Sequence, residues 1–91
     1  MYIVISIGNS DDRLAQKEWN RFVEDVIEAV SMAGKVRFFG GASTFAPWQN
    51  VAWIAEVQPK DMDSLTVSIQ RIRERYKQDS AFVMIGDGHF I

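Results

Sequence analysis

The chain has 91 residues, the length of one domain, so we expect a single unit over residues 1–91. Its formal net charge of −2 argues against a general nucleic-acid binder, and its 47% of hydrophobic residues argues against disorder. The absence of cysteine excludes disulfides, thiolate metal ligands and a cysteine nucleophile. No apolar run approaches the roughly 20 residues of a bilayer span, and the N-terminus lacks the pattern of a signal peptide. We therefore expect a soluble cytoplasmic protein without a membrane segment.

The first third of the chain predicts a strand, a polar turn and a long helix. Residues 2–7 are apolar on both alternating faces, which is typical of an interior strand. Residues 9–12 (Asn-Ser-Asp-Asp) are turn formers that favour helix N-caps, and the two acids would complement the helix dipole. Apolar residues then recur at helical spacing until Gly34, which we expect to end the helix. These positions are Ala15, Trp19, Phe22, Val23, Val26, Ile27, Val30 and Ala33.

The rest of the chain predicts three further strands and a second helix. Residues 35–41 alternate like a strand and end in two glycines, which indicate a bulge or a bend. After Pro59, apolar residues at spacings of three and four predict an amphipathic helix. Its buried positions would be Met62, Leu65, Ile69, Ile72 and Tyr76. The remaining segments are a loop at 42–50, a strand at 51–57, a strand at 81–86 and a tail at 87–91.

The order strand, helix, strand, strand, helix, strand most simply folds as a ferredoxin-like βαββαβ sandwich of the α+β class. We expect a four-stranded antiparallel sheet in the order 4-1-3-2, with both helices on one face. This topology brings residues 9–12 near Asp79 and Ser80 at one end of the sheet. It is expected to place residues 48–50 and the tail with His89 at the other end. Residues 9–12 and His89 therefore cannot share a metal site.

The face of the sheet opposite the helices would be open and apolar. Strand alternation assigns these residues to it: Tyr2, Val4, Arg37, Phe39, Phe82 and Met84. The third strand is apolar on both sides and adds either Trp53, or Ile54 with Glu56. Such a patch exceeds the few hundred Å² that a monomer usually exposes, so we expect a second copy of the chain or another protein to cover it.

Several polar stretches could bind a ligand, and each also has a structural interpretation. Residues 8–13 offer helix N-terminal donors to a phosphate and two acids to a cation, but a single glycine and adjacent acids fit capping better. Trp48, Gln49 and Asn50 form a loop that could stack on a ring and hydrogen-bond its edge, or pack against the sheet edge. His89 could act as a general base, but no serine or cysteine nucleophile can be placed beside it. A cationic run that complements the dipole of the second helix comprises Arg71, Arg73, Arg75 and Lys77.

The turn from Gly8 to Arg13, which follows a first strand, resembles the CRISPR-associated Cas2 proteins. That resemblance implies a small ferredoxin-like fold and, in the family, a metal-dependent nuclease aspartate at the end of the first strand. This chain has Ile7, Gly8 and Asn9 there, so the resemblance carries the fold and not the activity. The run from Ser6 to Leu14, with Trp19, Pro47 to Asn50 and Trp53, is also similar to small uncharacterised proteins of actinobacteria and their phages. That second resemblance implies no activity.

We expect a non-enzymatic module for protein interaction or self-association through the open sheet face. Its assembly would be a homodimer or a complex with another protein, with no cofactor, metal or catalytic residue. One alternative is nucleotide or single-stranded RNA binding on Tyr2 and Trp53 as stacking platforms, which the net charge disfavours. The other is a phosphodiesterase-like enzyme that holds a divalent metal with Asp11 and Asp12.

Overall fold

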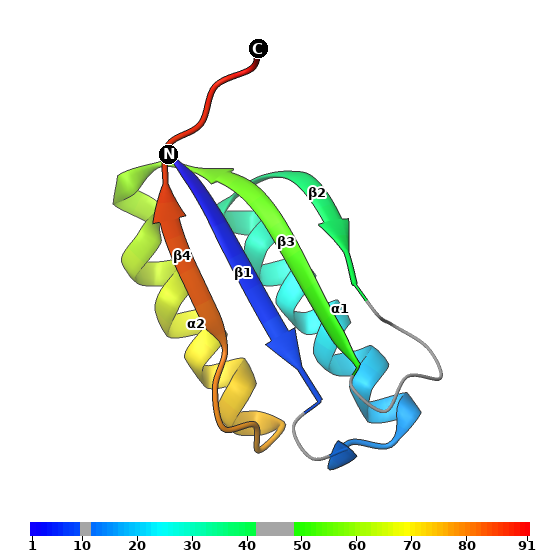
Figure 1. Ribbon diagram of the computed structural model, residues 1–91. Helices are drawn as coiled ribbons and strands as arrows, with labels where there is room; N and C mark the ends of the chain where they lie inside the picture. Colours follow the sequence, from blue (N-terminus) through cyan, green and yellow to red (C-terminus); the bar gives the residue numbers. More distant parts are fainter. Residues whose placement is uncertain (10–11, 42–48) are drawn as a thin grey trace.

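The computed structural model describes residues 1–9, 12–41 and 49–91. The elements within these residues are β1 (Tyr2–Gly8), α1 (Gln16–Ala33), β2 (Gly34–Gly40), β3 (Asn50–Val57), the 3-10 turn η2 (Pro59–Asp61), α2 (Met62–Arg75) and β4 (Phe82–Gly86). The strands form one sheet in the order β2-β3-β1-β4, and all neighbours are antiparallel. Read from the other edge, this is the predicted order 4-1-3-2. Both helices cover the same face of the sheet (Figure 1), so the ferredoxin-like α+β fold is confirmed.

The long helix α1 is amphipathic, as its sequence period predicts, and its start differs from the prediction. Its N-cap is Ala15, whose backbone N–H donates to the Glu18 carboxylate at 3.3 Å. The N-cap is therefore not one of residues 9–12, as predicted, but Ala15; of that turn, the described residue Asp12 has a positive φ of 51°. At the other end, Gly34 is the C-cap, as predicted. A Cβ at this position would collide with the carbonyl oxygen of Glu56, so glycine allows α1 to pass directly into β2 beside β3.

The hydrophobic core lies between the sheet and the two helices. Residues on β1 and β3 alternate strictly between buried and less buried positions, as one covered sheet face requires. Phe22 of α1 links the two helices because its ring is stacked at 5.1 Å on Tyr76, the C-cap residue of α2, and the same ring lies edge-on to its α1 neighbour Trp19. The strands contribute the buried residues Ile3, Ile5, Ile7, Val51, Trp53, Ala55 and Val57. The helices contribute Trp19, Phe22, Val26, Val30, Leu65, Ile69 and Ile72.

A β-bulge interrupts β2 and sets the direction of its side chains. Val36 pairs with Ala55 and Phe38 pairs with the adjacent Ile54, so Arg37 is the extra residue. A bulge or a bend was expected at Gly40 and Gly41, and the bulge of this strand lies earlier, at Arg37. Because of the extra residue, Phe38 points away from the helices, and Phe39 points toward them.

Candidate functional site

The candidate functional site is the face of the sheet that the helices leave uncovered. Large apolar side chains lie exposed on it: Phe38 is 58% exposed, Phe82 57%, Met84 53% and Ile54 37%. We call this surface the open face. It comprises Tyr2, Val4, Arg37, Phe38, Ile54, Glu56, Phe82 and Met84.

The register of the sheet arranges the open face in three rows that run across the strands. The middle row, from β2 to β4, is Phe38, Ile54, Val4 and Met84. The upper row, level with the start of β1, is Lys35, Glu56, Tyr2 and Gly86, with the bulge residue Arg37 beside Lys35. The lower row is Gly40, Ala52, Ser6 and Phe82. The middle row is wholly apolar, while the charged side chains lie in the upper row.

Two residues predicted for the open face lie elsewhere. Trp53 is fully buried on the helix side, because it pairs with Ile5, and directly opposed residues of antiparallel strands share a face. The β-bulge turns Phe39 to the same side, where its ring stacks on Trp53 at 6.0 Å. Phe38 and Ile54 occupy the positions on the open face instead. The remaining predicted members lie where the alternation put them: Tyr2, Val4, Arg37, Phe82 and Met84.

The burial of Trp53 bears on the nucleic-acid alternative. A base can stack only on an aromatic face that solvent reaches, and this indole is 0% exposed. The pair of stacking platforms predicted on Tyr2 and Trp53 is therefore wrong.

A polar cluster closes the upper end of the open face. A guanidinium nitrogen of Arg37 lies 3.3 Å from Oε2 of Glu56. The Tyr2 hydroxyl donates to the same carboxylate, which raises the pKa of Tyr2 and lowers the pKa of Glu56, and Arg37 lowers the latter further. Arg37 and Glu56 therefore neutralise each other, the neutral Tyr2 adds a hydrogen bond to the same carboxylate, and their arrangement fits a polar rim beside an apolar centre.

The tail that follows β4 adds a wall to this end of the open face. Residues Gly86 to Phe90 and the sheet border an open groove of about 360 Å³, whose floor includes Val4, Ile54 and Met84. Phe90 is 86% exposed, so the tail adds a further large apolar side chain to the surface.

The predicted ligand loop lies at the opposite end of the sheet from the tail. Asn50 pairs with Gly8 because β3 is antiparallel to β1, so Gln49 lies beside Asn9 and not, as predicted, away from it. Gln49 is 7% exposed, accepts a hydrogen bond from Asn9 Nδ2 at 2.9 Å, and donates to Gln16 Oε1 at 2.7 Å. Its amide thus holds the protein's own loops together. Asn50 is an exposed residue of β3, and Trp48 lies outside the described residues.

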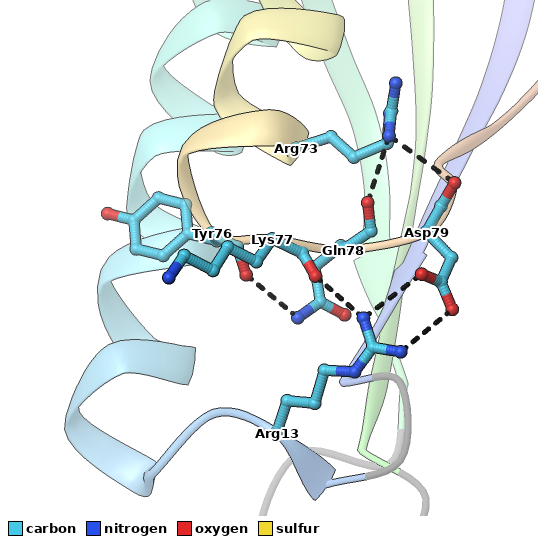
Figure 2. Close-up of polar contacts among 6 residues, drawn as sticks. All are labelled: Arg13, Arg73, Tyr76, Lys77, Gln78 and Asp79. Carbon is cyan, nitrogen blue, oxygen red and sulfur yellow. Dashed lines mark hydrogen bonds and ion pairs between the residues drawn. The ribbon is translucent and has the colours of Figure 1, made fainter.

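Arg13 joins the turn after β1 to the connection between α2 and β4, and Arg73 of α2 holds the same connection from the helix side (Figure 2). Arg13 donates to the carbonyl oxygen of Lys77 at 2.9 Å and forms an ion pair with Asp79 at 3.1 Å. Arg73 donates to the carbonyl oxygen of Gln78 at 3.0 Å. The expected proximity of this turn to Asp79 is confirmed. The predicted cationic run serves separate contacts, since Arg75 instead pairs with Asp25 of α1 at 3.4 Å.

The metal alternative depends on Asp11 and Asp12, of which the structure describes only Asp12. In the described ranges, no group of three or more His, Asp or Glu side chains could hold a metal ion. Asp12 is exposed, and Asp11 lies outside the described residues. His89 follows β4, whose end pairs with the start of β1, so it lies far from Asp12, as expected.

Two comparisons with known proteins find no match for this chain. No protein-family model matches it, and no curated protein matches it. The resemblances to actinobacterial and phage proteins and to Cas2 sequences stay predictions. Within the described part of the chain, neither helix has the length and apolar character needed to cross a bilayer.

Proposed function

We propose that this protein is a non-enzymatic interaction module of the cytoplasm, which binds another protein chain through its open face. The observation that supports this proposal is the middle row with its neighbour Phe82, where large apolar side chains are between 37% and 58% exposed. Monomeric proteins rarely leave large contiguous apolar patches in water, because their burial is favourable. A patch of this kind favours a binding surface.

The composition of the open face also fits protein interfaces. Its four most exposed apolar residues leave on the order of 400 Å² in water, which is the size of the largest apolar patch on a typical monomer, and such a patch is often a functional surface. Protein interfaces place an apolar centre within a polar rim. The middle row supplies the centre, and the cluster of Tyr2, Arg37 and Glu56 supplies one side of the rim.

The proposal is tested by placing a charge at the centre of the open face. We expect Met84→Lys to release the protein from the assembly that it forms in extracts of its host. The matched control is Val67→Lys, because Val67 is 44% exposed on α2 and adds the same charge on the helix side. Gentle purification followed by native mass spectrometry measures the assembly, and circular dichroism checks that helical content is unchanged. A wild-type monomer in the extract, or a Met84→Lys variant that stays assembled, would refute the proposal.

A further inference from the structure

We infer that the occupant of the open face is a second copy of this chain, packed face to face about a two-fold axis that runs parallel to the strands. This inference rests on the proposed function and names its partner. It follows from the order of residues along the three rows, which match themselves when their direction is reversed.

The proposed axis fixes which strands meet. A two-fold rotation about an axis along the strands turns the sheet over and keeps each row at its own height. It also reverses the order of the strands, so β2 of one copy lies over β4 of the other, and β3 lies over β1. Each row of the open face therefore meets the same row in reverse order.

The middle row is self-complementary under this rotation. Phe38 lies over Met84 of the second copy, and Ile54 lies over Val4 of the second copy. Every contact in the row is between two apolar side chains, and the most exposed of them lie at its ends. The row would form the dry centre of the interface.

The lower row pairs a large side chain with the smallest one. Phe82, at one end, lies over Gly40 of the second copy, which has no side chain to collide with. The Phe38 ring leans over that glycine, with its Cζ 3.2 Å from the position a Cβ would take. Phe82 of one copy would thus meet the ring of Phe38 in the other, a contact that aromatic pairs favour.

The upper row places cationic side chains of one copy over the acidic start of the other copy's tail. Lys35 and Arg37 of β2 lie over the end of β4, where Asp87 begins the tail, and Glu56 lies over Tyr2 of the second copy. A two-fold axis perpendicular to the strands, in contrast, would place the upper row over the lower row. Arg37 and Glu56 keep their ion pair within each copy in either arrangement, but Lys35 would then face Gly40 instead of the acidic start of the tail. The position of Lys35 therefore favours the axis parallel to the strands.

The area is sufficient for a dimer of modest affinity. Two copies of the apolar surface, with the polar rim, bury on the order of 1,000 Å², at the low end of specific interfaces. Two sheets that pack in this way lie about 10 Å apart, with their strands turned by about 30°. The helices remain on the outside of such a dimer.

The experiment uses the purified chain alone and the fact that its sequence has no cysteine. Sedimentation velocity over a concentration series should show a reversible dimer, which Met84→Lys weakens at least about tenfold and Val67→Lys does not. Single-cysteine variants then report the axis through a short bis-maleimide cross-linker. A mixture of Phe38→Cys and Met84→Cys should cross-link, whereas Phe38→Cys alone and the control Val67→Cys should not.

Two outcomes would overturn the inference. The first is a purified chain that stays monomeric at every concentration. If Met84→Lys nevertheless releases the protein from its assembly in host extracts, the proposed function stands and the partner is a different protein. The second is a dimer in which Phe38→Cys links to itself, since that places the axis perpendicular to the strands. A dimer that cross-links only between the two different variants supports the inference.

Discussion

Replacement of Asn9 by aspartate tests how the end of β1 is held. Asn9 is 3% exposed, and its side-chain amide makes three hydrogen bonds. Its Nδ2 donates to the carbonyl oxygen of Leu14 and to Oε1 of Gln49, and its Oδ1 accepts from the backbone N–H of Leu14, each at 2.9 Å. Asn9→Asp keeps the acceptor and removes both donors, so a carboxylate would face two buried oxygens.

The expected loss follows from these bonds. A buried polar group without a hydrogen-bond partner costs roughly 1–3 kcal/mol. Asn9→Asp leaves two such groups, the Leu14 carbonyl oxygen and Gln49 Oε1, beside a new charge. Rotation of the Gln49 amide would recover one bond, but it also requires the Gln16 amide that accepts from Gln49 to turn over. We therefore expect a loss of about 3–5 kcal/mol at neutral pH, which for a chain of this size lowers Tm by more than about 10 °C.

The pH dependence identifies the cause. Burial and two facing oxygens should raise the pKa of the new carboxyl in the folded state, whereas the unfolded chain keeps the ordinary value near 3.9. The protonated form can donate to one of the oxygens. The variant should therefore recover part of its stability below about pH 4 and lose it as the pH rises through the folded pKa.

Denaturant unfolding of both proteins across this pH range measures the effect. The matched control is Asn20→Asp, an equal change of charge at an exposed position of α1, with an expected effect within about 0.5 kcal/mol. A loss below about 1 kcal/mol in Asn9→Asp, or a loss that does not depend on pH, would show that these hydrogen bonds do not hold the turn.

Two further substitutions test the contacts that join the elements. Gly34→Ala should cost about 2 kcal/mol or more in denaturant unfolding, because its Cβ would collide with the Glu56 carbonyl, whereas Gly86→Ala, with nothing within 4 Å, should be nearly neutral. Equal effects of the two glycine substitutions would contradict this packing. Tyr76→Phe should cost about 1 kcal/mol, since the hydroxyl donates to Asp25 Oδ2 at 2.6 Å. Burial and this bond raise the pKa of Tyr76, so the stability that its hydroxyl contributes is present below about pH 10 and is lost above it. In thermal melts, the Tm of Tyr76→Phe should therefore fall less at alkaline pH than the Tm of the wild type. An equal fall of Tm in both proteins would contradict the assignment.

The fold could be predicted because hydrophobic period and chain order both point to it. The stripe of α1 and the apolar strands fix the element types, and antiparallel neighbours with helices on one face follow from their order. Element ends were less certain, because the start of α1 carries no side-chain cap at Ala15. Only Glu18, three residues further on, signals that start.

The candidate site could be predicted only in part, because β3 is apolar on both sides. Trp53 and Ile54 are both acceptable on either face, because apolar residues occupy both alternating sides of β3 and the alternation therefore does not assign them. Their orientation is set by pairing with β1, where Trp53 lies opposite the inward-facing Ile5. That register depends on where the connection between β2 and β3 ends, which composition does not reveal.

The bulge at Arg37 determines which aromatic residue the open face presents. In a regular strand, alternation would place Phe39 on the open face and Phe38 against the core, and the middle row would lack an aromatic residue at its β2 end. The extra residue exchanges the two rings, so Phe39 covers the buried Trp53 and Phe38 extends the row. The same bulge, with Lys35 and Arg37, disfavours the addition of another strand to this edge of the sheet, because bulges and cations are features by which edge strands avoid pairing. At the β2 side of the molecule, association is therefore directed away from the edge and onto the face, where Phe38 lies over Met84 of the second copy in the proposed dimer.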